Sequence, residues 1–252
     1  MSSIKFDILT LFPEMFSPLD ESMVGRARKS GLLDIDLINL RDYSTDKHKK
    51  TDDTPFGGGP GMVMMADPLF RALRSVESST KRVIYMSPRG RILDKELIQE
   101  LAEEKEICLI CGHYEGVDQR VLDHFDAEEV SIGDFVLTGG ELPAMVLIDS
   151  VARMIPGVLS SEEAALGESV YSGLLEYPQY TKPRSYEGMD VPDVLTSGDH
   201  EKIRLWQFEK ALELTKERRP DLLREYSGRR DRMSKKEKKI FDAIAGDTDT
   251  EK

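Results

Sequence analysis

The stretch GHYEGVDQR at residues 112–120, followed by SIGDFVLTGGE at residues 131–141, decides the fold class of this chain. Each stretch carries a glycine turn, Gly112–Gly116 in the first and Gly139–Gly140 in the second, directly after an apolar run that is typical of a strand. Glycine allows backbone conformations and close approaches that a Cβ atom would prevent. Such turns at the ends of neighbouring parallel strands predict a cleft for a small molecule at the carboxyl edge of a sheet.

Outward from this stretch, strand and helix patterns alternate along the first 160 residues. We expect strands at 4–11, 32–39, 82–86, 106–111 and 127–132, and helices at 14–30, 67–77, 94–102, 117–123 and 141–154. Residues 41–61 predict a long loop, and Ser87–Gly90 predicts a turn. Strands that alternate with helices predict an α/β domain with a mostly parallel sheet that is covered on both faces.

The composition changes after residue 157, and the change predicts a second domain. Asp199 or Ser197 is the expected N-cap of a helix through Arg218, and Ser234 with Glu237 forms a capping-box pattern before a last helix. We therefore expect four segments along the chain: an α/β domain at 1–160, a linker at 161–178, a small helical domain at 179–245 and a frayed tail at 246–252.

The charge is divided unevenly. The chain has a net charge of −12, which by itself argues against a nucleic-acid partner. Residues 200–240, however, hold 14 lysines and arginines against 8 aspartates and glutamates. A basic segment on an acidic protein fits a surface for a polyanion, and a solvated helical surface is the alternative explanation. The single tryptophan, Trp206, is expected in the core of the helical domain rather than as a platform for a base.

The two cysteines, Cys108 and Cys111, have the C-x-x-C spacing of metal and redox motifs. Both fall inside a predicted strand, where side chains three residues apart point to opposite faces. We therefore expect buried, apolar cysteines, and we expect no metal site, because the four histidines (His48, His113, His124 and His200) also lack metal-ligand spacing.

Neither a membrane span nor a signal peptide is expected. No apolar run approaches the roughly 18 residues that a spanning helix needs. The N-terminal MSSIKFDILTLFPE has no charged region followed by a long apolar region and a cleavage site. The expected location is cytoplasmic.

The glycine-rich segment Gly57–Gly61 follows a basic run, Lys47–Lys50. It matches neither the phosphate loop of nucleotide hydrolases nor the dinucleotide fingerprint G-x-G-x-x-G. Its exposed amides would let a base or a phosphate approach closely, and a purely structural turn is the alternative. Together with YMSPRG at 85–90 and the two opening stretches, it makes a set of loops in which Glu115, Asp118, Asp134 and Glu141 are caps or pocket groups.

Five motifs resemble bacterial tRNA (guanine-N(1)-)-methyltransferases of the SPOUT superfamily. They are TPFGGGPGM (54–62), YMSPRGR (85–91), ICGHYEGVDQRV (110–121), SIGDFVLTGGELPAMVLIDSVARMIPGVL (131–159) and GLLEYPQYTKP (173–183). The resemblance runs collinearly from Phe6 to about Leu223. It implies a trefoil-knotted α/β domain, a homodimer with shared active sites, and a helical tRNA-binding domain. It also implies methyl transfer from S-adenosylmethionine to N1 of the guanine immediately 3′ of the tRNA anticodon (position 37). This methylation supports reading-frame maintenance. The resemblance further implies a dependence on magnesium.

The resemblance also implies roles for individual residues. Cofactor-binding positions are Tyr85, Met86, Ser87, Pro88, Gly112, Tyr114, Glu115, Gly116, Ile132, Gly133, Asp134, Phe135, Val136, Leu137, Gly139, Gly140 and Pro143, and the loop that meets the target guanine is Gly57, Gly58, Gly59 and Pro60. Arg153 matches the catalytic arginine. The linker matches a segment that becomes ordered over the active site when tRNA binds.

One position departs from the family pattern. The general base of the family is an aspartate five residues before the glycine of the G-L-L motif, which is Gly173 here, so Glu168 takes that place. A base is required because N1 of guanine carries a proton at neutral pH, and an arginine stabilises the charge that develops on the exocyclic oxygen. Val170 also replaces a phenylalanine. Two other readings stay open: an RNA-binding relative with weak catalysis, and a nucleotide-binding regulator.

Overall fold

The structure is a computed structural model that describes residues 3–159 and 168–246. The chain divides into two compact units, residues 1–162 and 163–252, and each is described by itself. Of the expected linker, residues 161–167 lie outside the described residues, and so does the expected tail apart from Gly246. Among the described residues, no helix has the length and apolar character needed to cross a membrane.

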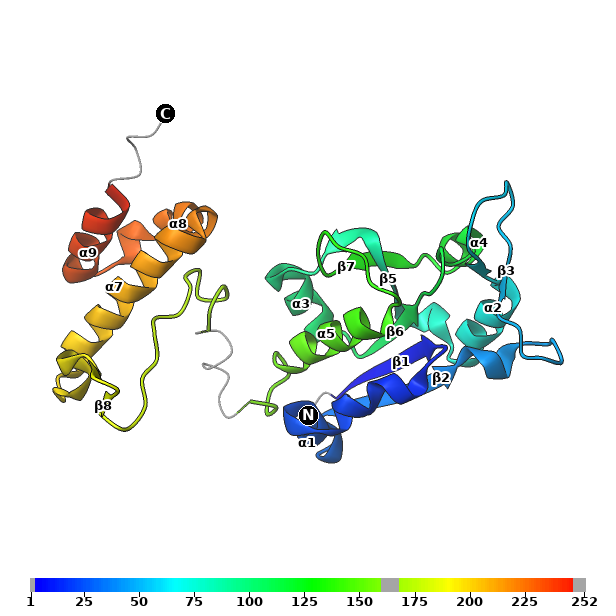
Figure 1. Ribbon diagram of the computed structural model, residues 1–252, viewed down its shortest axis with the longest axis horizontal. Helices are drawn as coiled ribbons and strands as arrows, with labels where there is room; N and C mark the ends of the chain where they lie inside the picture. The colour runs from blue at the N-terminus through cyan, green and yellow to red at the C-terminus, as the bar shows by residue number, and fades with distance from the viewer. Residues whose placement is uncertain (1–2, 160–167, 247–252) are drawn as a thin grey trace. The chain divides into compact units, whose positions relative to one another are not determined.

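A five-stranded parallel sheet forms the centre of the first unit (Figure 1). Its strands are β1 (Ile4–Thr10), β2 (Leu33–Asn39), β5 (Arg82–Ile92), β6 (Glu106–Cys111) and β7 (Glu128–Ser131). They lie in the order β2-β1-β6-β5-β7, and each pair of neighbours is parallel. The expected mostly parallel α/β sheet is therefore confirmed. The trefoil knot stays a prediction, because strand order alone does not describe a knot.

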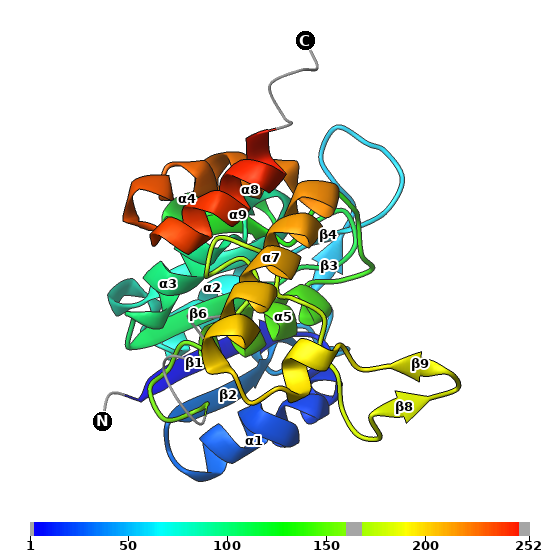
Figure 2. The ribbon, with the colours of Figure 1, turned by 90° about the vertical axis from the view of Figure 1, so that its left-hand side faces the viewer.

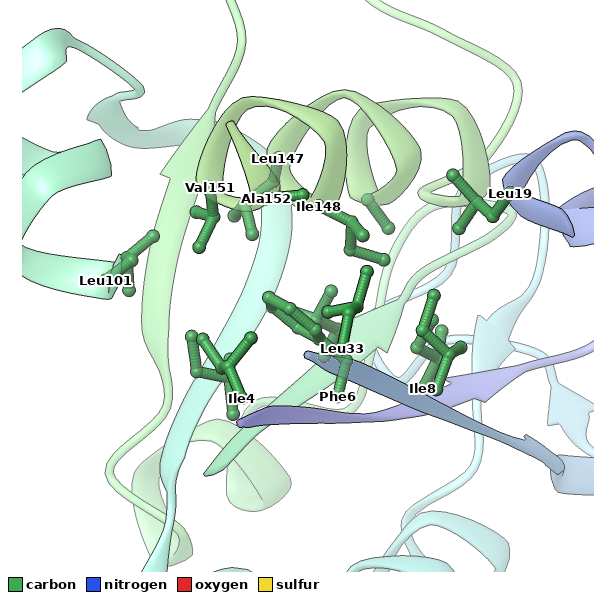
Figure 3. Packing of buried hydrophobic residues seen from close by; sticks show 14 of the residues in the cluster. Ile4, Phe6, Ile8, Leu19, Leu33, Leu101, Leu147, Ile148, Val151 and Ala152 are labelled. Atoms are coloured by element: carbon green, nitrogen blue, oxygen red, sulfur yellow. The ribbon is translucent and has the colours of Figure 1, made fainter. Parts of the chain in front are cut away.

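Helices cover both faces of this sheet, as expected for parallel strands. One face carries η1 (Pro13–Asp20), α1 (Ser22–Lys29), α3 (Lys95–Ala102) and α5 (Glu141–Ala152), and the other carries α2 (Ala66–Ser75) and α4 (Gln119–His124). On the first face, α5 packs its apolar side chains onto β1 and β2, where Phe6, Leu33 and Ile148 are almost or completely inaccessible to solvent (Figure 3). This packing holds the N-terminal end of α5 at the carboxyl edge of the sheet.

The two cysteines confirm the reasoning from strand periodicity. Cys111 packs into the cluster under α5, while Cys108 packs into the cluster under α2, on the opposite face. Burial raises the pKa of the Cys108 thiol to about 12 and raises the pKa of Cys111 well above its usual value. Both thiols are therefore neutral apolar groups at physiological pH.

Several local expectations are wrong. The helix expected at 14–30 is two helices that meet at Glu21, whose extended backbone (φ −107°, ψ 171°) interrupts the helical path. The helix expected at 67–77 is α2, which begins at Ala66 after the N-cap Met65 and ends at Ser75, so Asp67 lies inside its first turn. The loop expected at 41–61 contains the short helix η2 (Leu40–Tyr43) and strand β3 (Asp52–Asp53), which pairs with β4 (Val63–Met64).

The turn expected at Ser87–Gly90 does not end its strand. Strand β5 continues to Ile92, and residues 87–90 form a bulge between Met86 and Arg91, both of which pair with Val130 of β7. A Cβ atom on Gly90 would lie 2.2 Å from the carbonyl carbon of Glu129, so only glycine fits against the β7 backbone. Periodicity alone does not reveal such a bulge, because the partner strand lies about 40 residues away in sequence.

The described part of the second unit is built on the helices α7 (His200–Arg218), α8 (Pro220–Ser227) and α9 (Lys235–Ala245), as Figure 2 shows. Asp199 caps α7, and Ser234 with Glu237 forms the expected capping box of α9. The unit also contains short 3₁₀ helices and a hairpin that the sequence did not predict, β8 (Ser185–Tyr186) with β9 (Met189–Asp190). Its small core includes Leu174, Leu212, Leu223 and Phe241.

Substituting Gly90 tests the bulge. We expect Gly90→Ala to lower the free energy of unfolding by about 2 kcal/mol, because the new methyl group collides with backbone that cannot rotate away. Gly228→Ala is the matched control, since its nearest neighbour would be an ordinary contact at 3.4 Å and its φ is −61°. Urea denaturation measures both variants, and equal stability of the two would contradict the close approach.

Candidate active site

A cavity of about 260 Å³ opens at the carboxyl edge of the sheet, beside strands β6, β5 and β7. Three segments supply its walls: the end of β5, the loop after β6, and the loop between β7 and α5. Its lining residues are Tyr85, Met86, Ser87, Pro88, Gly112, His113, Tyr114, Glu115, Gly116, Val130, Ser131, Ile132, Gly133, Phe135, Val136, Leu137, Thr138, Gly139, Gly140 and Pro143. The edge is where a parallel α/β sheet binds its ligands.

Gly112 and Gly140 allow the backbones of the loop after β6 and the loop before α5 to contact each other directly. The N–H of Gly140 donates to the carbonyl oxygen of Gly112 at 2.9 Å. A Cβ atom on Gly140 would lie 2.7 Å from Cα of Cys111, and one on Gly112 would lie 2.6 Å from the ring of Tyr85. Any larger side chain would force the two loops apart and change the shape of the cavity.

Tyr85 forms the floor between these loops and is largely buried. Burial raises the pKa of its phenol, and the nearby carboxylate of Glu129 raises it further. The phenol is therefore a neutral hydroxyl at physiological pH. At the rim, Phe135 and Val136 are more than half exposed, so the cavity has an apolar lip.

The residues directly after the glycine-rich loop are hydrogen-bonded to the cavity wall. Glu115 donates its N–H to the carbonyl oxygen of Met62, and Met64 donates to that of Gly116, both at 2.9 Å. Gly57, Gly58, Gly59 and Gly61 all have positive φ values, which side chains disfavour. The neighbouring Phe56 is fully exposed, an aromatic group that the sequence analysis missed. The loop therefore presents the exposed backbone of Gly57–Gly61 and the ring of Phe56.

The residues assigned by resemblance to the cofactor lie together. All of them except Asp134 line the cavity. Val130, Ser131, His113 and Thr138 also line it and were missed. The first two are the last residues of a strand, so their proximity to the edge was readable from the strand's position. Asp118 is a cap, because its carboxylate accepts from the N–H of Arg120, and the Arg120 side chain lowers its pKa.

The two residues assigned to catalysis lie in different units. Arg153 directly follows α5 in the first unit and donates its N–H to the carbonyl oxygen of Asp149. Glu168 is the first described residue of the second unit, and its carbonyl oxygen accepts from the N–H of Ser172 at 3.1 Å. The turn it begins includes Val170, whose φ is +73°. Arg229 holds this turn by donating to the carbonyl oxygen of Ser172.

The basic residues of the second unit are partly engaged in ion pairs. Arg204 pairs with Glu237, Lys236 with Glu201, and Arg230 with Asp242. All of these side chains except that of Glu237 are well exposed, so the pairs contribute little to stability and remain available to a stronger anion. Trp206 lies outside the core cluster, and its ring centroid is 6.4 Å from that of Tyr180, which corrects the expectation of a core tryptophan.

Among the described residues, no three histidine, cysteine, aspartate or glutamate side chains are grouped so that they could hold a metal ion. The described lining of the cavity consists mainly of glycine backbone, hydroxyl groups and apolar side chains, with Glu115 as its carboxylate.

Comparisons with known proteins agree on one family. The family model described as tRNA (Guanine-1)-methyltransferase TrmD matches residues 4–225. A tRNA (guanine-N(1)-)-methyltransferase of Clostridium acetobutylicum is 54% identical over 239 residues, which cover 94% of this chain and 96% of that protein. Proteins with the same name from Alkaliphilus oremlandii (55% over 228 residues; 87% and 92% covered) and Clostridium novyi (50% over 241 residues; 95% and 98% covered) are similarly close.

Proposed function

The chain belongs to the TrmD family of tRNA (guanine-1)-methyltransferases, and we propose that its edge cavity binds S-adenosylmethionine while its second unit binds tRNA. The enzyme transfers the methyl group of S-adenosylmethionine to N1 of guanine 37, the nucleotide immediately 3′ of the anticodon, and so supports reading-frame maintenance. The observation that carries the proposed site is the convergence of three motif-bearing loops on one cavity.

The cavity fits S-adenosylmethionine by its chemistry. Backbone N–H and C=O groups of the glycine loops can pair with an adenine edge, and Ile132, Phe135 and Leu137 supply apolar contact. The bound cofactor supplies a methyl group on a positively charged sulfur, which is already reactive. The protein therefore contributes mainly alignment, through loops whose close backbone contacts leave them little freedom.

Two side chains act on the guanine during methyl transfer. Glu168 takes the proton from N1, and Arg153 stabilises the negative charge that develops on the exocyclic oxygen. We expect the loop Gly57–Pro60 to meet the base, because the residues that follow it, Met62 and Met64, are hydrogen-bonded to Glu115 and Gly116 of the cavity wall. The described residues provide no cluster for magnesium, so no step of this mechanism is assigned to a metal ion.

The second unit supplies the charge for tRNA. Its basic residues between 200 and 240 outnumber the acidic ones, and most of the exposed ion pairs would open for phosphates. Glu168 lies in the same unit, at the start of its described residues. We place the enzyme in the cytoplasm, where its tRNA substrate is found.

A homodimer fits the apolar surface of the first unit. Phe12 and Met15 in and beside η1 and Leu142 and Val146 on α5 are each between 39% and 47% exposed. Leu142 and Val146 lie one turn apart on the same face of α5, and α5 contacts η1. Exposed apolar side chains gathered in this way mark an interaction surface, and a second copy of the chain is the partner that we propose.

Methyl transfer to a defined tRNA tests the function. We expect labelled S-adenosylmethionine to methylate a transcript that carries guanines at positions 36 and 37, and to leave unlabelled a control with adenine at position 37. If the protein binds both the cofactor and the tRNA but transfers no methyl group, it is an RNA-binding relative with lost or weak catalysis. Tight binding of a nucleotide in place of the cofactor would favour the regulator.

Glu168→Gln tests the general base. Because the amide cannot accept the N1 proton, we expect the single-turnover rate to fall about 100-fold or more, with affinity for the cofactor retained. Glu176→Gln is the matched control, since Glu176 is an exposed carboxylate in the same segment. A full rate in Glu168→Gln would show that another group removes the proton.

Val146→Glu tests the dimer. A carboxylate buried in an apolar interface lacks a partner, so we expect sedimentation to give a monomer of 28.5 kDa in place of a dimer. Ile92→Glu is the control, because Ile92 has the same 46% exposure as Val146. A wild-type monomer, or an equal effect of both substitutions, would contradict this surface.

A further inference from the structure

A buried carboxylate beside the cavity has no part in the mechanism above. The side chain of Glu141, the first residue of α5, is 1% exposed. Its Oε1 accepts from the Thr10 hydroxyl at 2.7 Å, and its Oε2 lies 2.7 Å from Nε2 of His113. The imidazole tautomer that carries its hydrogen on Nε2 is the one that donates this second bond to the carboxylate oxygen.

These two bonds join three elements at the carboxyl edge. Thr10 is the last residue of β1, His113 lies in the loop after β6, and Glu141 begins α5. Burying a carboxylate is unfavourable unless hydrogen bonds replace those it made with water. The carboxylate therefore holds both of its partners in place, and the loop after β6 is held through His113.

The cavity loops close directly around this pair. His113 forms an isolated antiparallel bridge with Gly139. A Cβ atom on Gly139 would lie 2.3 Å from Cε1 of His113 and 2.6 Å from Oε2 of Glu141. Position 139 therefore has to be glycine, because a larger residue would collide with His113 and Glu141.

The surroundings keep the imidazole in place. The ring of Phe12 lies against it with centroids 4.9 Å apart, and the ring of Tyr114 lies 6.2 Å away. The backbone N–H of His113 points to the sulfur of Met64 at 3.2 Å. His113 itself is only 14% exposed and lines the cavity. The pair is shielded on all of these sides, which strengthens its hydrogen bond.

We propose that His113 and Glu141 form a clasp that sets the affinity for S-adenosylmethionine. The clasp holds the Gly112–Gly116 loop against Gly139–Gly140, so that the ligand does not have to order these loops when it binds. His113 is a positioning residue, because it acts through the two loops. The inference rests on the proposed function only in the identity of the ligand.

The experiment measures ligand affinity apart from catalysis. The variants are His113→Ala, which removes the donor, and His113→Gln, whose side-chain amide keeps one. Calorimetry with S-adenosylhomocysteine gives Kd, steady-state methyl transfer gives KM and kcat, and thermal unfolding without ligand gives Tm. His124→Ala is the control, since His124 is an exposed histidine of the same unit that does not line the cavity.

We expect His113→Ala to raise Kd and the KM for S-adenosylmethionine about tenfold, as expected for a lost hydrogen bond to a charged group, with kcat changed less than about threefold. His113→Gln recovers most of the affinity. Adding Glu141→Gln to His113→Ala raises Kd by less than about twofold more, because the two side chains act through one bond.

Other results would overturn the clasp. Unchanged Kd and KM in His113→Ala would do so, and so would a lower Tm in both His113 variants with no recovery of affinity by glutamine, which indicates a structural role alone. If His113→Ala does not fold, Glu141→Gln and His113→Gln are judged by the same Kd and KM. A wild-type protein that binds S-adenosylhomocysteine but methylates no tRNA refutes the proposed function and leaves the calorimetric test of the clasp valid. A wild type that does not bind the ligand refutes both.

Discussion

The contact between two backbone loops at the carboxyl edge of the sheet is the constraint on which the rest of the site depends. Gly140 and Gly112 meet through a hydrogen bond of 2.9 Å, and neither position has room for a side chain. The contact forms only if β6 and the N-terminus of α5 are brought to the same edge. The apolar packing of α5 on β1 and β2 brings them there, so the same packing forms the hydrophobic core and positions the loops of the cavity.

Polar groups add precision to that packing. A parallel sheet leaves its last carbonyl and amide groups unpaired at the edge, and these groups need partners if they are buried. In this protein the loops satisfy one another: Met64 pairs with Gly116, Gly140 with Gly112, and the Glu141 carboxylate pairs with two side chains. Few charges line the cavity itself. Such a site recognises its ligand by shape and backbone hydrogen bonds, which suits a transfer that depends on alignment.

The division into two units separates the cavity from Glu168, the residue that we propose as the base. The loops of the first unit contact each other directly, whereas the turn that begins at Glu168 belongs to the second unit and is held there by Arg229. If Glu168 is the base, its carboxylate stands one methylene further from the backbone than the aspartate that the family resemblance implies at this position. The consequence for the rate depends on how this turn meets a bound tRNA, since the reacting nitrogen belongs to the tRNA.

The sequence by itself determined the α/β class, the cysteines on opposite faces, the capping box at Ser234, and nearly all of the cavity loops. These features follow from local periodicity, from capping chemistry and from motifs, and each involves residues that are close in sequence. Only the tertiary structure decided the bulge at residues 87–90, the fully buried Glu141 and its partner His113. Thr10 and Glu141 are 131 residues apart. Contacts over such distances arise when strands and helices pack, so no local pattern of residues encodes them.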